Sequence, residues 1–459
     1  MSPSTVDYHQ HQYESWKRLV PYLYDWFANH SLVWPSLSCC WGPRPDNMMD
    51  TVQENKNKNQ SGGRVMPTHR AGSWSHAGML HDSGAVLYLS EQTDGSVMNT
   101  LVMAYLDIPK KRSQYGGPVA NGGPAQQLHV AKTILHPGEV NKVVDIPQYP
   151  GVVVTHSDAP EVYVWNMNTQ PDRVASPKDM KASVADVVLV GHAENAEFAL
   201  GRSDVKPLVA SGGKDRNVLV WNIDNVPMGG HGTMLSPDTV LEGHEDTVED
   251  VTFKPGSCVE VASVADDSAL ILWDTRQMKS TFIVRDAHGK NKDVHCCDWS
   301  ALTPTRLVTG AQDGSVHVWD TRKLESPVLV LQHHTQAVMN VAWSPHTKDV
   351  FATGSDDGLV CLWDVSRGGS GQQKNIPVPD ELLLQHAGHQ TSVVDFCWNP
   401  DEPWTIMSAS VDSSTGKGGG TLQTWKVSDL VYKSEEQLMS ELEPYRDYIV
   451  SGDESQLPK

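Results

Sequence analysis

The stretch Leu307–Arg322 reads LVTGAQDGSVHVWDTR, and it places a threonine, an aspartate and a tryptophan at intervals of four and six residues. This set occurs four times in the chain, as Ser211–Asp215–Trp221, Ser263–Asp267–Trp273, Thr309–Asp313–Trp319 and Thr353–Asp357–Trp363. A pattern of such regular spacing predicts one structural unit repeated along the chain, and repeats of this kind decide a fold before any single motif does.

Tryptophan ends a short β-rich run in six places, in VYVWN, VLVWN, LILWD, VHVWD, VCLWD and LQTWK. These residues are Trp165, Trp221, Trp273, Trp319, Trp363 and Trp425, at successive separations of 56, 52, 46, 44 and 62 residues. A unit of about 40 to 45 residues with loop insertions is the period of a four-stranded blade and carries the WD40 signature. The strand-like run 86–108 lacks the tryptophan and supplies a seventh unit. The sequence therefore predicts an all-β, seven-bladed WD40 β-propeller.

A histidine precedes the serine or threonine of five units by 19 or 21 residues: His192, His244, His288, His334 and His389. One Ser, His and Asp set is compatible with a hydrolase, because catalytic triads are recognised by geometry rather than by order. Five copies indicate a structural network instead, in which aspartate orients histidine, histidine reaches the hydroxyl, and the hydroxyl reaches the indole N–H. We therefore predict no catalytic centre and no cofactor.

Charge and cysteine usage narrow the class of protein further. The chain of 459 residues holds 36 Lys and Arg against 56 Asp and Glu, a formal net charge of −20. Such a surface disfavours direct nucleic-acid binding and favours basic partners. The seven cysteines form no CxxC pair and no zinc-ligand spacing, which predicts a reducing compartment and no metal. No apolar run reaches membrane-spanning length and no signal peptide is recognisable, so we expect a cytosolic or nuclear protein.

The two ends of the chain are predicted to be helical. The stretch Tyr13–Leu37, YESWKRLVPYLYDWFANHSLVWPSL, places apolar residues at steps of three and four: Trp16, Leu19, Val20, Leu23, Trp26 and Phe27. We expect an N-terminal helix over 8–33 with a kink or restart at Pro21, and a short C-terminal helix over 434–449 capped by Ser434 and Gln437. The propeller then occupies 34–430, Trp34–Gly42 is the strand donated to the last blade, and 450–459 is a polar tail.

Several motifs together resemble the MSI-type, retinoblastoma-binding WD40 histone-binding proteins: WKRLVPYLYDWFANHSLVWPSL, GHEDTVEDV and HAGHQTSVVDFCWNPDEPWTI. The resemblance runs from about Tyr13 to about Tyr448 and is greatest to the plant FVE-type branch, through YLSEQTDGS, HAENAEFAL and GGGTLQTWKVSDLVY. It implies a non-enzymatic nuclear scaffold that binds histones H3 and H4 for chromatin-assembly, histone deacetylase or Polycomb-type complexes. In plants it implies transcriptional repression that promotes flowering.

The resemblance also implies where each histone binds. A groove between the N-terminal helix and the loop 366–385 would hold a helix of histone H4, and its residues are Tyr22, Leu23, Asp380, Glu381, Leu383 and Leu384. Lys374 and only two carboxylates make this loop less acidic than is typical of the family.

A second site, on the narrow face of the propeller, would hold the histone H3 tail: Glu139, Asn141, Phe198, Glu249, Asp250, Asp267 and Glu402. Ala337 and Met339 stand where the family can present an acid and an aromatic, which predicts a weaker contact there.

A different reading rests on the two WDTR turns that end at Arg276 and Arg322. They resemble the box with which WD40 substrate receptors dock on the adaptor of a cullin-RING ubiquitin ligase, and an exposed arginine can anchor such a contact. A ligase substrate receptor is therefore the alternative to the histone scaffold. The short basic run KKR at 110–112 is the one indication of nuclear import.

Overall fold

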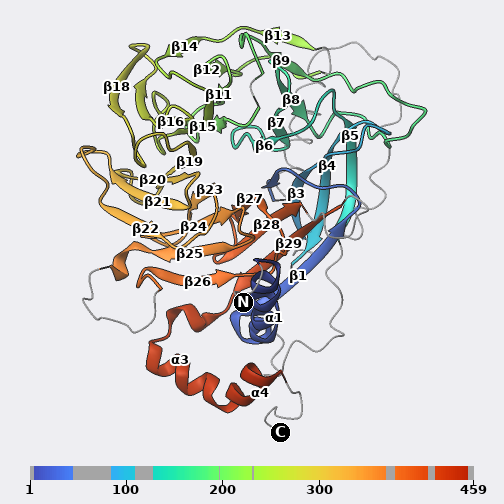
Figure 1. Ribbon diagram of the computed structural model, residues 1–459. Coiled ribbons are helices and arrows are strands. Elements are labelled where there is room, and N and C mark those ends of the chain that lie inside the picture. Colours follow the sequence, from blue (N-terminus) through green and yellow to red (C-terminus); the bar gives the residue numbers. More distant parts are fainter. Residues whose placement is uncertain are drawn as a thin grey trace.

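The computed structural model describes residues 5–44, 84–108, 128–195, 197–229, 232–368, 378–411 and 419–452. The basic run at 110–112 and residues 369–377 of the predicted groove loop, Lys374 among them, lie outside these ranges. Seven β-sheets are arranged in a ring, with helices at both chain ends below it (Figure 1). The predicted seven-bladed propeller is thus confirmed. In the described part of the chain, no helix is long and apolar enough to cross a membrane.

Each blade is an antiparallel sheet, described from its inner to its outer strand. Blade 1 is β2 (Cys39–Trp41), β3 (Gly84–Glu91), β4 (Thr100–Asp107) and β5 (Leu128–Leu135). Blade 2 is β6 (Lys142–Asp145), β7 (Val152–His156), β8 (Val162–Asn166) and β9 (Val187–Leu189), with β13 (Thr233–Leu235) added in parallel to β9. Blade 3 is β10 (Leu200–Arg202), β11 (Leu208–Gly212), β12 (Asn217–Asn222) and β14 (Thr239–Glu242). Blade 4 is β15 (Val248–Phe253), β16 (Glu260–Ala265), β17 (Leu270–Asp274) and β18 (Lys279–Val284).

The remaining three blades follow the same order. Blade 5 is β19 (Val294–Trp299), β20 (Arg306–Ala311), β21 (Ser315–Asp320) and β22 (Leu329–Gln332). Blade 6 is β23 (Val338–Trp343), β24 (Val350–Ser355), β25 (Val360–Asp364) and β26 (Leu382–His386), with a 3-10 turn, η1 (Val365–Arg367), after β25. Blade 7 is β27 (Val393–Trp398), β28 (Thr405–Val411), β29 (Gly420–Val427) and, from the other end of the chain, β1 (Tyr24–Leu32).

Ring closure corrects one prediction. The strand donated to blade 7 is β1, which pairs antiparallel with β29 and sets Phe27 opposite Trp425. The segment Trp34–Gly42, predicted for that role, instead provides β2, the inner strand of blade 1. Tyr24 and Trp26 are buried two residues apart, the alternation of a strand, and this outweighs the helical spacing of the same apolar residues.

The N-terminal helix α1 (Thr5–Leu23) is therefore shorter than the predicted range 8–33. It continues through Pro21 to Leu23, so the expected break comes two residues after the proline, where the chain turns into β1. The cost of Pro21 is small here because a proline near the end of a helix removes few backbone hydrogen bonds.

The C-terminal segment consists of a 3-10 turn η2 (Asp429–Tyr432), α3 (Glu435–Leu442), a turn η3 (Glu443–Tyr445) and α4 (Arg446–Ser451). The predicted capping box is present, because Ser434 accepts from the Gln437 N–H while the Gln437 side chain accepts from Ser434. The predicted apolar stripe of α3 is not buried, since Met439 is 59% exposed. The short helix α4, not α3, contacts α1.

The predicted histidine network is complete in two blades. In blade 4, His244 lies 3.0 Å from Asp267 and 2.7 Å from Ser263, and the Trp273 indole donates to Ser263 at 2.8 Å. Blade 6 repeats this arrangement with His334, Asp357, Thr353 and Trp363. The indole, imidazole and hydroxyl are all buried and all paired, which is the structural role that the repetition predicts.

The other blades vary this network. In blade 5, Ser315 stands between His288 and Asp313, and in blade 3 the Trp221 indole donates to the Val190 carbonyl rather than to the serine. Blade 7 uses a second serine, Ser410, in place of the aspartate. The sequence pattern also missed a copy in blade 2, where His136 binds Thr155 and Thr155 accepts from Trp165.

One buried carboxylate joins four blades at the axis. Asp395 in β27 of blade 7 accepts from the Ser38 hydroxyl at 2.7 Å and the Cys39 N–H at 3.0 Å in blade 1. It also lies 2.9 Å from the Lys142 ammonium of blade 2 and accepts from the Asn340 amide of blade 6 at 2.5 Å. Blades 1 and 7 are the two between which the ring closes, so this carboxylate reinforces the closure.

Replacing Asp395 by alanine should therefore lower the free energy of unfolding by about 3 to 5 kcal/mol, because it strands a largely buried ammonium and several donors. Chemical denaturation measures this loss. The matched control is Asp401→Ala, which removes an exposed ion pair with Arg44 and should cost less than about 1 kcal/mol. Equal losses in the two variants would contradict the role of Asp395.

Candidate binding surfaces of the propeller

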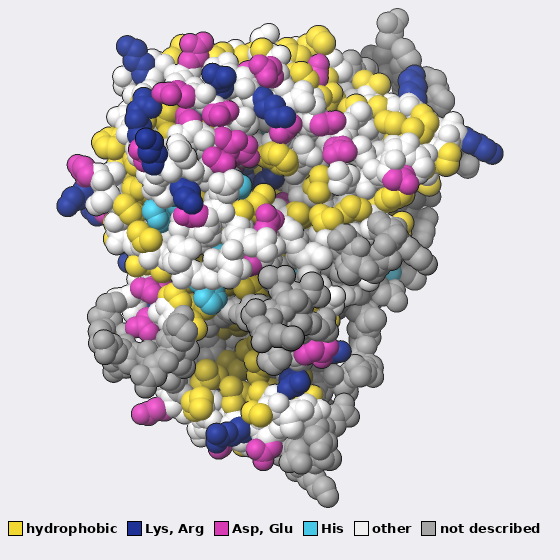
Figure 2. Space-filling view, in the orientation of Figure 1, with side chains coloured by type: hydrophobic (Ala, Val, Ile, Leu, Met, Phe, Trp, Pro, Cys, Tyr) yellow, Lys and Arg dark blue, Asp and Glu magenta, His cyan; other side chains and the backbone are white. Residues whose placement is uncertain are grey.

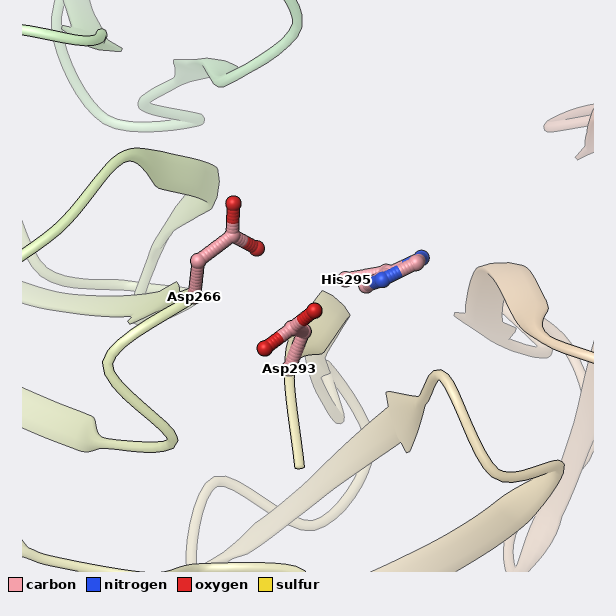
Figure 3. Close-up of side chains that lie close together, drawn as sticks. All are labelled: Asp266, Asp293 and His295. Carbon is pink, nitrogen blue, oxygen red and sulfur yellow. The ribbon is translucent and has the colours of Figure 1, made fainter. Parts of the chain in front are cut away.

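Acidic side chains gather where the inner strands of blades 4 and 5 begin. Glu249 lies at the start of β15, in a bulge between Val248 and Asp250. Asp266 lies in the turn between β16 and β17, and faces Asp293 and His295 at the start of β19 (Figure 3). Potential ligand atoms of Asp266, Asp293 and His295 lie within 4.8 Å of one another. We call Glu249, Asp266, Asp293 and His295 the channel mouth.

The carboxylates of the channel mouth are poorly compensated. Burial, followed by repulsion from Asp266 and other acids, raises the pKa of Glu249 to about 8. Burial and the neighbouring Asp293 raise the pKa of Asp266 to about 6. Nearby lysines are used elsewhere, since Lys214 binds Glu197 at 2.5 Å and Lys292 lies 3.9 Å from Asp313. Within the described ranges no Lys or Arg forms an ion pair with Glu249, Asp266 or Asp293, so the mouth has the electrostatics of a site for a cationic ligand.

Three more residues predicted for the histone H3 tail lie toward the same end of the blades. Phe198, in the loop before β10, is 46% exposed and offers an aromatic surface. Glu139 accepts from the Gln92 amide at 2.8 Å and lines a cavity of about 430 Å³ with Asp94 and His136. Asn141 is buried directly before β6.

The structure does not bring the remaining three predicted tail residues to this surface. Asp267 is engaged by His244 in the blade 4 network. Asp250 is buried and accepts from the Cys297 N–H, and burial raises its pKa to about 6. Glu402 follows the end of β27 and binds Lys426 at 3.3 Å. Because inner strands run in the same direction around the channel, the end of β27 is opposite the mouth.

A second surface lies between α1 and blade 6. Leu23 of α1 and Leu383 and Leu384 of β26 pack, only partly buried, against one hydrophobic cluster, together with Val20 and Val431. Figure 2 shows hydrophobic side chains gathered in a hollow between the propeller and the C-terminal helices. The structure thus brings together the predicted apolar residues of the helix groove.

A buried chain of hydrogen bonds fixes α1 in this place. The Trp16 indole donates to the Tyr24 hydroxyl at 2.9 Å, and that hydroxyl lies 2.6 Å from Nδ1 of His386. Nε2 of His386 lies 2.8 Å from the Gln423 side-chain oxygen. Burial lowers the pKa of His386 to about 3, so its ring is neutral and accepts from Tyr24 while donating to Gln423. Helix, strand β1 and blades 6 and 7 are therefore positioned together.

The polar groups of the predicted groove are placed differently from its leucines. Tyr22 packs against Tyr445, with ring centroids 4.7 Å apart, and burial followed by the nearby tyrosines raises its pKa to about 12. Its contact is the C-terminal segment rather than β26. Asp380 and Glu381 directly precede β26, and the Glu381 side chain lies close to Gly368 at the start of the groove loop.

The two WDTR arginines lie directly after β17 and β21. Each guanidinium binds the aspartate two residues before it, Arg276 to Asp274 and Arg322 to Asp320, through two hydrogen bonds. Their side chains are 68% and 72% exposed. They occupy equivalent positions in adjacent blades, and each guanidinium is already shared with its own aspartate.

Known proteins share both the repeats and the N-terminal region. Residues 235–274, 279–320, 325–364 and 381–415 match the WD domain, G-beta repeat. Residues 11–110 match the family of the histone-binding protein RBBP4, which is also described as a component of the CAF1 complex. The chain is 40% identical to the WD-40 repeat-containing protein MSI4 of Arabidopsis thaliana, over 96% of its own length and 86% of that relative.

Seven tryptophan-centred blades and matched repeats define a WD40-repeat propeller. The N-terminal match begins in α1, and the similarity to MSI4 extends over nearly the whole chain. The protein belongs to the MSI-type, RBBP4-like family of histone-binding WD40 proteins.

Proposed function

We propose that this protein is a non-enzymatic scaffold that holds a helix of histone H4 between α1 and β26. The observation that carries the proposal is the shared cluster of Leu23, Leu383 and Leu384, on a helix held in place by Trp16 and Tyr24. An amphipathic helix binds such a groove through its apolar face, and partly buried leucines are the anchors this mode requires. The family match over residues 11–110 supports the same groove.

The basic tail of histone H3 is the proposed ligand of the channel mouth. Lysine and arginine of an extended peptide would supply the positive charge that Glu249, Asp266 and Asp293 lack within the described chain. Phe198 offers an exposed aromatic ring for an aliphatic or cationic side chain. Glu139 and Asn141 extend the surface toward blade 2. The two histone surfaces lie on different parts of the propeller, so we expect them to act independently.

The proposed cellular role is that of a nuclear component of chromatin-assembly, histone deacetylase or Polycomb-type complexes, acting in repression and, in a plant, in promoting flowering. The similarity to MSI4 and the family description support a role on chromatin. The repeated Ser, His and Asp sets support a scaffold rather than a hydrolase, because they are used to hold the blade tryptophans.

Replacing Leu23 and Leu384 together with aspartate should abolish binding of a histone H4 helix peptide, because two charges would face its apolar side without partners. Isothermal titration measures the loss, which we expect to exceed about 100-fold. Val330→Asp, an equivalent change on the exposed outer strand of blade 5, is the matched control and should bind normally. H4 binding retained by the double variant would contradict the groove, and simultaneous loss of H3-tail binding would indicate a damaged propeller.

Binding of an H3 tail peptide should strengthen as the pH rises from 6.5 to 9. Glu249, with a pKa raised to about 8, is mostly protonated at the lower pH, and a cationic peptide favours its ionised form. Fluorescence titration of wild type and Glu249→Gln separates this effect from other titrating groups, since the variant should show a flatter pH dependence. Identical pH profiles would exclude Glu249 from the tail site.

A ubiquitin-ligase adaptor remains the alternative partner, and the exposure of Arg276 and Arg322 in equivalent turns favours it. Replacing both arginines with alanine should weaken capture of a purified adaptor while histone binding stays within about twofold, because the two surfaces are separate. A pull-down with adaptor and histones in parallel measures both. Unchanged adaptor capture would remove this alternative, and lost histone binding would show that the surfaces are coupled.

A further inference from the structure

Three potential metal ligands meet between blades 4 and 5. Asp266 comes from the turn between β16 and β17, whereas Asp293 and His295 come from the first residues of the next inner strand (Figure 3). Their ligand atoms all lie within 4.8 Å of one another. In a tetrahedral zinc site, bonds of about 2.0 to 2.2 Å place neighbouring ligand atoms about 3.3 Å apart. The half-buried side chains need to close by only about 1.5 Å to reach that spacing.

His295 lacks the hydrogen bond that a buried ring nitrogen normally makes. Its Nδ1 is inaccessible to solvent and has no hydrogen-bond partner among the described residues. Burial lowers the pKa of His295, although Asp293 and Asp356 oppose the shift. A neutral imidazole with a free nitrogen is the form that binds metals.

The two carboxylates lack a counter-charge of their own. Asp266 is surrounded by the like charges of Asp293, Asp246 and Asp267. Across the described ranges, neither Asp266 nor Asp293 forms an ion pair with a lysine or an arginine. A bound cation would remove the repulsion between them and satisfy the imidazole at the same time.

We propose that Asp266, Asp293 and His295 bind a divalent transition-metal ion, with Zn²⁺ as the best match. One nitrogen and two carboxylate oxygens suit zinc, whereas magnesium and calcium prefer sites made only of oxygen. Three protein ligands leave a fourth position open to water or to a group of a bound partner. The proposal rests on these three side chains and stands whether or not the channel mouth binds a histone.

Isothermal titration of the full chain with Zn²⁺ alone tests the site. The chain holds 20 histidines, so weak binding elsewhere is expected and the comparison between variants decides. Asp293→Asn and His295→Gln should each weaken the tightest binding event by at least about tenfold, since each removes one ligand. Asp246→Asn, which removes a neighbouring charge without removing a ligand, should stay within about twofold. Circular dichroism confirms that each variant is folded.

Zinc affinity unchanged in His295→Gln, or weakened as much in Asp246→Asn as in Asp293→Asn, would overturn the proposal, because binding would then reflect diffuse negative charge. Equal affinity of the wild type for Mg²⁺ would also overturn it. Anomalous diffraction from crystals soaked in Zn²⁺ gives a second readout. The expected result is a peak between Asp266, Asp293 and His295, and zinc peaks only at other positions would contradict the assignment.

Discussion

The carboxylate of Asp395 is the point at which closure of the ring is decided. A propeller that closes between its first and last blades must join strands from opposite ends of the chain, and an open edge would leave unpaired backbone groups. Here β1 completes blade 7, while Asp395 ties blade 7 to blades 1, 2 and 6 through Ser38, Lys142 and Asn340. Closure therefore depends on strand pairing at the rim and on charge and hydrogen bonding at the axis.

Closure also places the candidate groove. Strand β1 follows α1 without a linker, so pairing β1 with β29 brings the helix beside blades 6 and 7. The bonds from Trp16 through Tyr24 and His386 to Gln423 then fix the helix, and Leu23 and Leu384 pack against the same cluster. The groove is therefore a consequence of how the ring closes, and it cannot be separated from the stability of blade 7.

Residues that repeat once per blade were predictable from the sequence, because each blade must solve the same packing problem around one tryptophan. Features that occur once were not. The helical spacing of Trp26 masked its place in a strand, Glu402 lies on the far end of its blade, and Asp395 has no local motif. Asp266 and His295 come from different blades, so no ligand spacing connects them, and the apolar groove residues were found only through family resemblance. Sequence patterns report local periodicity, whereas these contacts depend on the geometry of the closed ring.

If α1 and β26 form one binding groove for a histone helix, both segments must respond when that helix binds. Hydrogen–deuterium exchange of the full chain, with and without a histone H4 helix peptide, tests this most directly, because exchange slows where a ligand covers or stabilises the backbone. We expect slower exchange in residues 12–23 and 378–386, with blades 3 to 5 unchanged. Peptide binding that leaves both segments unaffected and protects another face of the propeller would contradict the groove.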